Sequence, residues 1–171
     1  MSSNIPLRFF IAGLFAFSWI GSAFSQTPSI DAKLCKTLPV EEIEAVVGAK
    51  LLRKSGVDAA EFNSCTAFFG SGGVMVKVER RSPGQEGLPP DVKAGLTGIS
   101  TIFGSAFKGL KTKDFGEIGC YQGTFEAGGG VKTTVCFQPK GYYSLTIGGL
   151  SEFLPMETVK GLLEKLMAAS R

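Results

Sequence analysis

The sequence has 171 residues, a formal net charge of +3 and no histidine. Without histidine, the chain lacks Ser-His-Asp and Cys-His nucleophile systems, histidine general bases and the commonest zinc ligand. A charge this small does not indicate a nucleic-acid partner or a strongly anionic one. We therefore expect a non-enzymatic protein that binds no nucleic acid, no metal and no cofactor.

Residues 1–25 have the pattern of an export signal. Arg8 precedes the apolar run Phe9–Ile20, and the small residues Ala23 and Ser25 stand where signal cleavage requires them. We expect cleavage before Gln26, which leaves residues 26–171 as a single domain, with no integral membrane span, in the periplasm or outside the cell. A retained anchor is the alternative, although the apolar run is shorter than the roughly 20 residues that span a bilayer.

Three segments begin with Leu-Pro and continue with an acidic residue, at Leu38, Leu88 and Leu154. Proline suits the first helical position, and a carboxylate there complements the helix dipole. Apolar residues then recur at helical spacing as far as Val47, Phe107 and Met167, which predicts three helices. The shared opening is explained either by an internal duplication or by general helix-start chemistry.

Strands are predicted between these helices. Phe62–Phe69 and the alternating valines from Val74 read as a hairpin across Gly70–Gly73, and this register turns Cys65 into the core. A three-strand meander is predicted near residues 117–126, 131–138 and 142–149, and residues 50–54 add one more strand.

Within that meander we expect Val135 to oppose Leu145 and Phe137 to oppose Tyr143. Between the second helix and the meander, the basic cluster of Lys108, Lys111 and Lys113 is expected on a solvated loop.

Four cysteines in an exported chain predict two disulfides. Cys120 and Cys136 stand symmetrically about the Gly-rich turn at Gly128. Folding there pairs Tyr121 with Val135 on one face, and a slip of one residue would separate both pairs. Directly opposed strand residues lie within disulfide reach. Elimination then predicts a second disulfide between Cys35 and Cys65.

Together these elements predict an α+β fold. We expect a single domain in which an antiparallel β-meander sheet carries two or three helices packed on one apolar face, with two disulfides.

Carboxylates are the remaining route to catalysis. Asp114, Glu117 and Glu126 are the candidates for a pair that hydrolyses a glycosidic bond, although solvated turn positions explain them equally. The glycine runs Gly70–Gly73 and Gly128–Gly130 lead into strands rather than helices, so we interpret them as hairpin turns and not as phosphate loops. No catalytic, cofactor or metal residue is assigned.

The spacing Cys35-x-x-Leu38-Pro39, followed by Gly48, a cysteine entering a hairpin and a closing amphipathic helix, resembles small bacterial exported domains of unknown function. Many of these are lipoproteins, whereas this chain lacks a lipid-attachment cysteine after its apolar run. The resemblance implies a fold and an exported location only.

From these features we expect a non-enzymatic exported binding or accessory module, with an unknown protein or an apolar small molecule as its partner. The alternatives are an extracellular carboxylate-dependent hydrolase and a secreted inhibitor or interaction protein.

Overall fold

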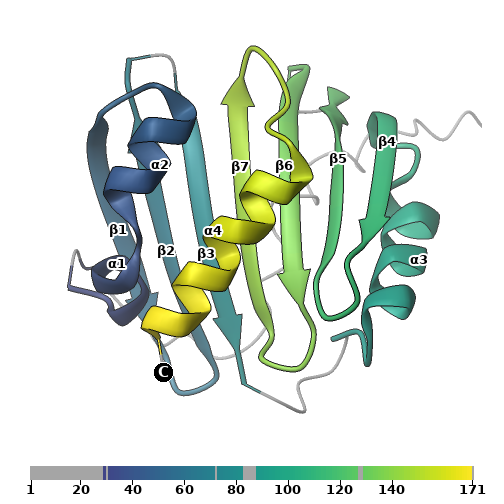
Figure 1. Ribbon diagram of the computed structural model, residues 1–171, viewed down its shortest axis with the longest axis horizontal. Coiled ribbons are helices and arrows are strands. Elements are labelled where there is room, and N and C mark those ends of the chain that lie inside the picture. Colours follow the sequence, from purple (N-terminus) through teal and green to yellow (C-terminus); the bar gives the residue numbers. More distant parts are fainter. Residues whose placement is uncertain (1–28, 30, 72, 83–87, 127–128, 171) are drawn as a thin grey trace, which may run out of the picture.

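The computed structural model describes residue 29 and residues 31–71, 73–82, 88–126 and 129–170. The predicted signal sequence, residues 1–25, and its cleavage point at Gln26 lie outside the described residues. The described chain forms an antiparallel sheet of seven strands with four helices (Figure 1), so the fold is α+β with strands predominating.

The helices are α1 (Lys33–Thr37), α2 (Val40–Val47), α3 (Val92–Phe103) and α4 (Met156–Ala169). The strands are β1 (Leu51–Asp58), β2 (Phe62–Phe69), β3 (Val74–Arg81), β4 (Phe107–Asp114), β5 (Gly119–Phe125), β6 (Val131–Gln138) and β7 (Tyr143–Leu150).

The strands lie in the order β1-β2-β3-β7-β6-β5-β4, so the last strand of the sequence occupies the centre of the sheet. Two antiparallel meanders, β1–β3 and β4–β7, meet where β3 pairs with β7. The predicted pairing of Phe69 with Val74 and of Cys65 with Val78 is confirmed. The segment at 50–54 does contribute a strand, β1, which extends to Asp58.

The two halves of the chain repeat one arrangement. In each half, a helix opened by Leu-Pro precedes three strands that fill the sheet from an edge inward, α2 before β1–β3 and α3 before β4–β6. A half-turn about the axis of β7 would superimpose the strand directions and exchange the two faces of the sheet. The third Leu-Pro segment, before α4, has no strands after it, so internal duplication and general helix-start chemistry both remain explanations of the shared opening.

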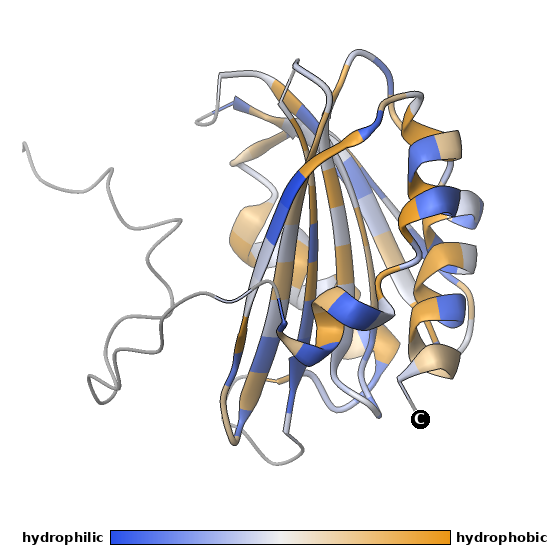
Figure 2. Ribbon diagram, turned by 90° about the vertical axis from the view of Figure 1, so that its left-hand side faces the viewer, coloured by the Kyte–Doolittle hydropathy of each residue, from blue (hydrophilic) through white to orange (hydrophobic). Residues whose placement is uncertain are grey.

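One face of the sheet, called here the helical face, carries α1, α2 and α4 (Figure 1). The apolar side of α4 is buried against alternate residues of the central strands, and Figure 2 shows this helix with its hydrophilic positions turned outward. The fully or nearly buried side chains of this core include Ile43, Phe69, Val76, Val78, Leu145, Ile147, Val159, Leu163 and Leu166.

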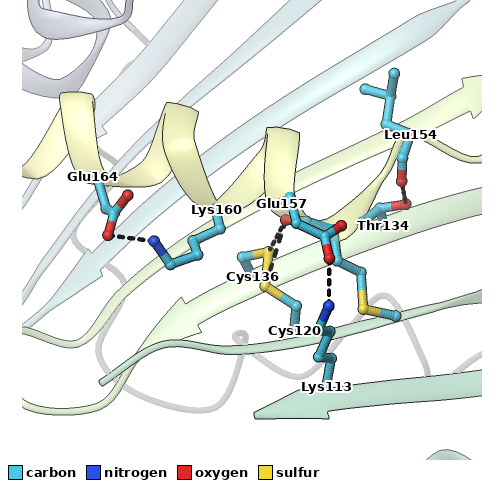
Figure 3. Close-up of a disulfide and its surroundings, with 9 residues drawn as sticks. Lys113, Cys120, Thr134, Cys136, Leu154, Glu157, Lys160 and Glu164 are labelled. Atoms are coloured by element: carbon cyan, nitrogen blue, oxygen red, sulfur yellow. Dashed lines mark hydrogen bonds and ion pairs between the residues drawn. A yellow bond between two sulfur atoms is a disulfide. The ribbon is translucent and has the colours of Figure 1, made fainter. Parts of the chain in front are cut away.

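Both predicted disulfides are present. Cys35–Cys65 joins α1 to β2 across a Cα–Cα distance of 5.1 Å, and Cys120–Cys136 joins opposed residues of β5 and β6 across 4.1 Å. All four cysteines are fully buried. The second disulfide lies under the start of α4, where Sγ of Cys136 is 3.6 Å from the carbonyl oxygen of Met156 (Figure 3).

The predicted register between β6 and β7 is wrong by one residue. Cys136, not Val135, opposes Leu145, because a four-residue turn separates the paired residues Gln138 and Tyr143. The disulfide consequently shares its face with Leu145, and α4 covers this face.

Three further expectations are corrected. Phe107 does not end a helix: α3 stops at Phe103, and Phe107 begins the edge strand β4. Lys108, Lys111 and Lys113 accordingly lie on a strand instead of a loop. The predicted helices also divide between faces, because α3 packs beside Gly119 and Phe137, which point away from α4.

Candidate binding surface

The side of the sheet opposite α4 is only partly covered. Helix α3 makes its main contacts with β4 and β5, at one edge of this side. It comes close to the sheet because Gly95 and Gly119 have no side chains to hold it away from Phe137. None of the described helices packs over β1, β2, β3 and β7 from this side. We call the outward side chains of these four strands the open face.

The residues of the open face follow from the strand registers, because successive side chains alternate between faces. Those of β2 and β3 that point away from the core valines are Phe62, Ser64, Thr66, Phe68, Met75, Lys77, Glu79 and Arg81. Neighbouring strands add Arg53, Ser55, Val57, Ser144 and Thr146. The surface is therefore mixed, with aromatic rings, a methionine, hydroxyls and charges side by side.

An arginine lies over a phenylalanine ring at each end of β2. The guanidinium of Arg53 is 4.7 Å from the ring centroid of Phe68, its partner across β1 and β2. The guanidinium of Arg81 is 5.8 Å from the ring centroid of Phe62, its partner across β2 and β3. A cation over an aromatic face is held by the ring quadrupole, which limits the conformations of the arginine.

An ion pair occupies the middle of this surface. Nζ of Lys77 lies 2.6 Å from Oε1 of Glu79, two residues along the same strand. Further across the sheet, burial and, to a smaller extent, the negative charge of Glu79 together raise the pKa of the Tyr121 phenol to about 12. Tyr121 thus marks the boundary between the open face and the part under α3, and its hydroxyl is neutral at ordinary pH.

A strained turn borders the same end of the sheet as Arg81. Tyr142 has a φ of +52°, and no other described residue apart from glycine has a positive φ. Its carbonyl oxygen accepts a hydrogen bond from the Arg81 N–H at 3.1 Å, which fastens the β6–β7 turn to the end of β3. On the helical face, Arg80 lies over the Tyr143 ring at 5.2 Å.

Of the three candidate catalytic carboxylates, two lie near each other and the third lies apart. Asp114 accepts a hydrogen bond from the Gly116 N–H and lies with Glu117 near the start of β5, whereas Glu126 follows the end of that strand. Glu117 pairs with Lys140 at 3.3 Å. A carboxylate pair that cleaves a glycosidic bond has to flank one cleft, and residues at opposite ends of a strand do not.

Among the described residues, two carboxylates have a clearly perturbed pKa, and both serve structural contacts. The Lys50 ammonium and the Leu51 N–H lower the pKa of Glu44, and the Lys113 ammonium lowers the pKa of Glu157. A general acid requires the opposite shift. In the described part of the chain, no group of cysteine and carboxylate side chains is placed to hold a metal ion.

Neither glycine run forms a ligand loop in the described residues. Gly70 and Gly73 have positive φ values at the β2–β3 turn, and Gly129 and Gly130 have them at the β5–β6 turn. These are hairpin conformations that glycine adopts at little cost. No described helix is long and apolar enough to cross a membrane.

Comparison with protein-family models, with curated proteins and with solved structures finds no match for this chain. The open face therefore has to be interpreted from its own residues. Sequence reasoning did not single out Arg53, Phe62, Phe68 or Arg81. Phenylalanine on both sides of β2, at Phe68 and Phe69, was the available signal that this strand has two apolar faces.

Proposed function

We propose that the protein is an exported, non-enzymatic binding module that engages a partner protein with its open face, in the periplasm or outside the cell. The observation that carries the proposal is the contrast between the two sides of the sheet. The helical face is covered by three helices and fastened by two disulfides, whereas four strands of the other side lack a described helical cover.

The composition of the open face supports a protein partner. Phenylalanine, methionine and arginine are enriched at the centres of protein interfaces, and Phe62, Phe68, Met75, Arg53 and Arg81 supply them here. A single aliphatic side chain at a protein surface is common and needs no explanation. Aromatic, methionine and arginine side chains grouped on one sheet are instead typical of an interaction site. A secreted inhibitor would use the same kind of surface, so that alternative is a special case of the proposal.

Site-specific photo-crosslinking tests this function. Ser55 is exposed on the open face, and Ala168 is exposed on the outer side of α4. With p-benzoylphenylalanine at either position in the producing cells, we expect a discrete protein adduct from position 55 and none from position 168. Absence of an adduct from position 55, or equal adducts from both positions, overturns the proposal.

Intact mass spectrometry tests the exported state. The proposal requires a chain that begins at Gln26 and carries no free thiol before reduction. A chain that retains Met1 contradicts cleavage, and four free thiols contradict an oxidising location.

A further inference from the structure

Lysines of this protein form both ion pairs and contacts with aromatic rings, whereas the described arginines form only the latter. All seven ion pairs among the described residues join a lysine to a carboxylate. The three described arginines, Arg53, Arg80 and Arg81, instead each lie over an aromatic ring. A guanidinium can form two parallel hydrogen bonds to one carboxylate, which an ammonium cannot. None of the described arginines forms such a pair with a described carboxylate.

Resting on the binding function proposed above, we propose that the open face recognises an acidic surface of its partner protein, with carboxylates received by Arg53 and Arg81. A guanidinium stacked on a ring keeps its N–H edges free for a carboxylate. Stacking also fixes its orientation beforehand, so less side-chain entropy is lost on binding.

The separation of the two arginines indicates a macromolecule. Arg53 opposes Phe68 and Arg81 opposes Phe62, so six residues of β2 separate the two stacks. At about 3.3 Å per residue the guanidinium groups lie on the order of 20 Å apart. One small anion cannot reach both, whereas a protein surface with two acidic positions can.

The charges between the stacks leave the two arginines as the unbalanced groups. Lys77 and Glu79 neutralise each other at 2.6 Å in the middle of the face. Arg53 and Arg81 are therefore the two charged side chains of the open face that remain outside this ion pair, on a protein whose formal net charge is only +3. Attraction would be local and short in range, which agrees with the absence of a nucleic-acid signature in the composition.

The decisive experiment combines the photo-crosslinker at position 55 with charge reversal. Arg53→Glu/Arg81→Glu is compared with Lys93→Glu/Lys108→Glu, which makes the same change in net charge at exposed positions of α3 and β4. We expect at least a tenfold loss of adduct in the arginine variant and less than a twofold change in the lysine variant. Undiminished adduct in the arginine variant overturns the acidic-partner inference and leaves the binding function standing.

A defined probe gives an independent measure. Fluorescent poly-L-glutamate is titrated with the purified protein at low salt, and heparin is used as a competing sulfated glycan. We expect poly-L-glutamate to bind, with affinity reduced at least tenfold by Arg53→Gln/Arg81→Gln and several-fold by Arg53→Lys/Arg81→Lys, because lysine offers a point charge instead of a planar fork. Three results would overturn the inference: poly-L-glutamate does not bind, Arg53→Lys/Arg81→Lys loses as much affinity as Arg53→Gln/Arg81→Gln, or the protein binds heparin more tightly than poly-L-glutamate.

Discussion

A Cβ atom on Gly95 would lie 2.6 Å from Cε2 of Phe137, so α3 packs on the sheet at a distance that only glycine permits at this position. Three residues along the same helix, a Cβ on Gly98 would meet no heavy atom within 4 Å. Close packing of the helix therefore requires glycine at position 95, whereas position 98 has room for a larger side chain.

This difference gives a matched pair of substitutions. Gly95→Ala is expected to lower the free energy of unfolding by about 1–3 kcal/mol, because the Phe137 ring or the helix must move. Gly98→Ala is expected to raise it by about 0.5–1 kcal/mol through helix propensity. Urea unfolding of both variants measures the effects, and equal changes in the two variants would contradict the proposed packing of α3.

Tyr121 predicts a loss of stability in alkaline solution. Its folded-state pKa is raised to about 12, above the value of 10.0 for a free tyrosine. Below pH 10 the phenol is neutral in both states and the contribution is complete. Between pH 10 and pH 12 the unfolded chain ionises first, so the free energy of unfolding falls.

The free energy of unfolding is expected to fall by about 1–2 kcal/mol. This is less than a pKa difference of two units implies, because the Tyr121 side chain is partly exposed to solvent. Tyr121→Phe should remove this part of the pH dependence in urea unfolding. In a titration of tyrosine absorbance at 295 nm, Tyr121→Phe should also remove the tyrosine that ionises at the highest pH. Trp19 is the only tryptophan, so a chain that begins at Gln26 gives a tyrosine signal without a tryptophan contribution. If the free energy of unfolding of the wild-type protein changes with pH as that of Tyr121→Phe does, the pKa of Tyr121 is not raised by folding.

The disulfides predict resistance to reduction in the folded state. All four cysteines are fully buried, so a thiol reagent has no path to the sulfur atoms. Treatment with dithiothreitol and then iodoacetamide should label none of them in native buffer and all four in urea. Labelling of two cysteines under native conditions would identify one disulfide as accessible and contradict this burial.

Removing each disulfide should also reveal its contribution. Cys120→Ala/Cys136→Ala opens a loop of sequence separation 16, and Cys35→Ala/Cys65→Ala opens one of 30. Loop entropy predicts a loss of about 3 kcal/mol for the first variant and about 0.5 kcal/mol more for the second. Urea unfolding checks the order, and a larger loss for the shorter loop would show that packing of the sulfur atoms under α4 dominates.

The turn at Tyr142 predicts a stabilising substitution. A bulky residue with positive φ is strained, whereas asparagine adopts this conformation more readily. Tyr142→Asn is therefore expected to raise the free energy of unfolding by about 0.5–1 kcal/mol. The midpoint of urea unfolding should rise accordingly. Lys140→Asn, at an exposed position of the same turn, serves as the control and should be nearly neutral. Destabilisation by Tyr142→Asn would show instead that the ring contributes to packing.

The sequence allowed the hairpins to be predicted where one register satisfied several residues together. Cys120 opposed Cys136 only when Tyr121 opposed Val135, and the structure has both pairs. The next register was missed because both faces of β6 are buried, with Thr134 and Cys136 on one and Val135 on the other. Val135 is buried on the side of α3, while Leu145 on β7 is buried under α4, so sorting by hydrophobicity could not choose between them.

Strand β4 and the open face were missed for a different reason. Phe107 continued a helical spacing, and the residues after it are polar because an edge strand is solvated on both sides. The open face joins Arg53, Phe68 and Arg81 from three strands. Its residues become neighbours only once the order of the strands is known, which local patterns do not contain.

The central position of β7 governs the order in which the molecule can be completed. Until residues 143–150 are in place, β3 and β6 each present an unpaired edge, and α4, which packs on β5, β6 and β7, lacks one of its three strands. Pairing between strands that are far apart in the sequence is slow to form. The two meanders therefore become one sheet only when this single strand pairs on both of its sides, so a change that weakens β7 would separate the two halves of the molecule.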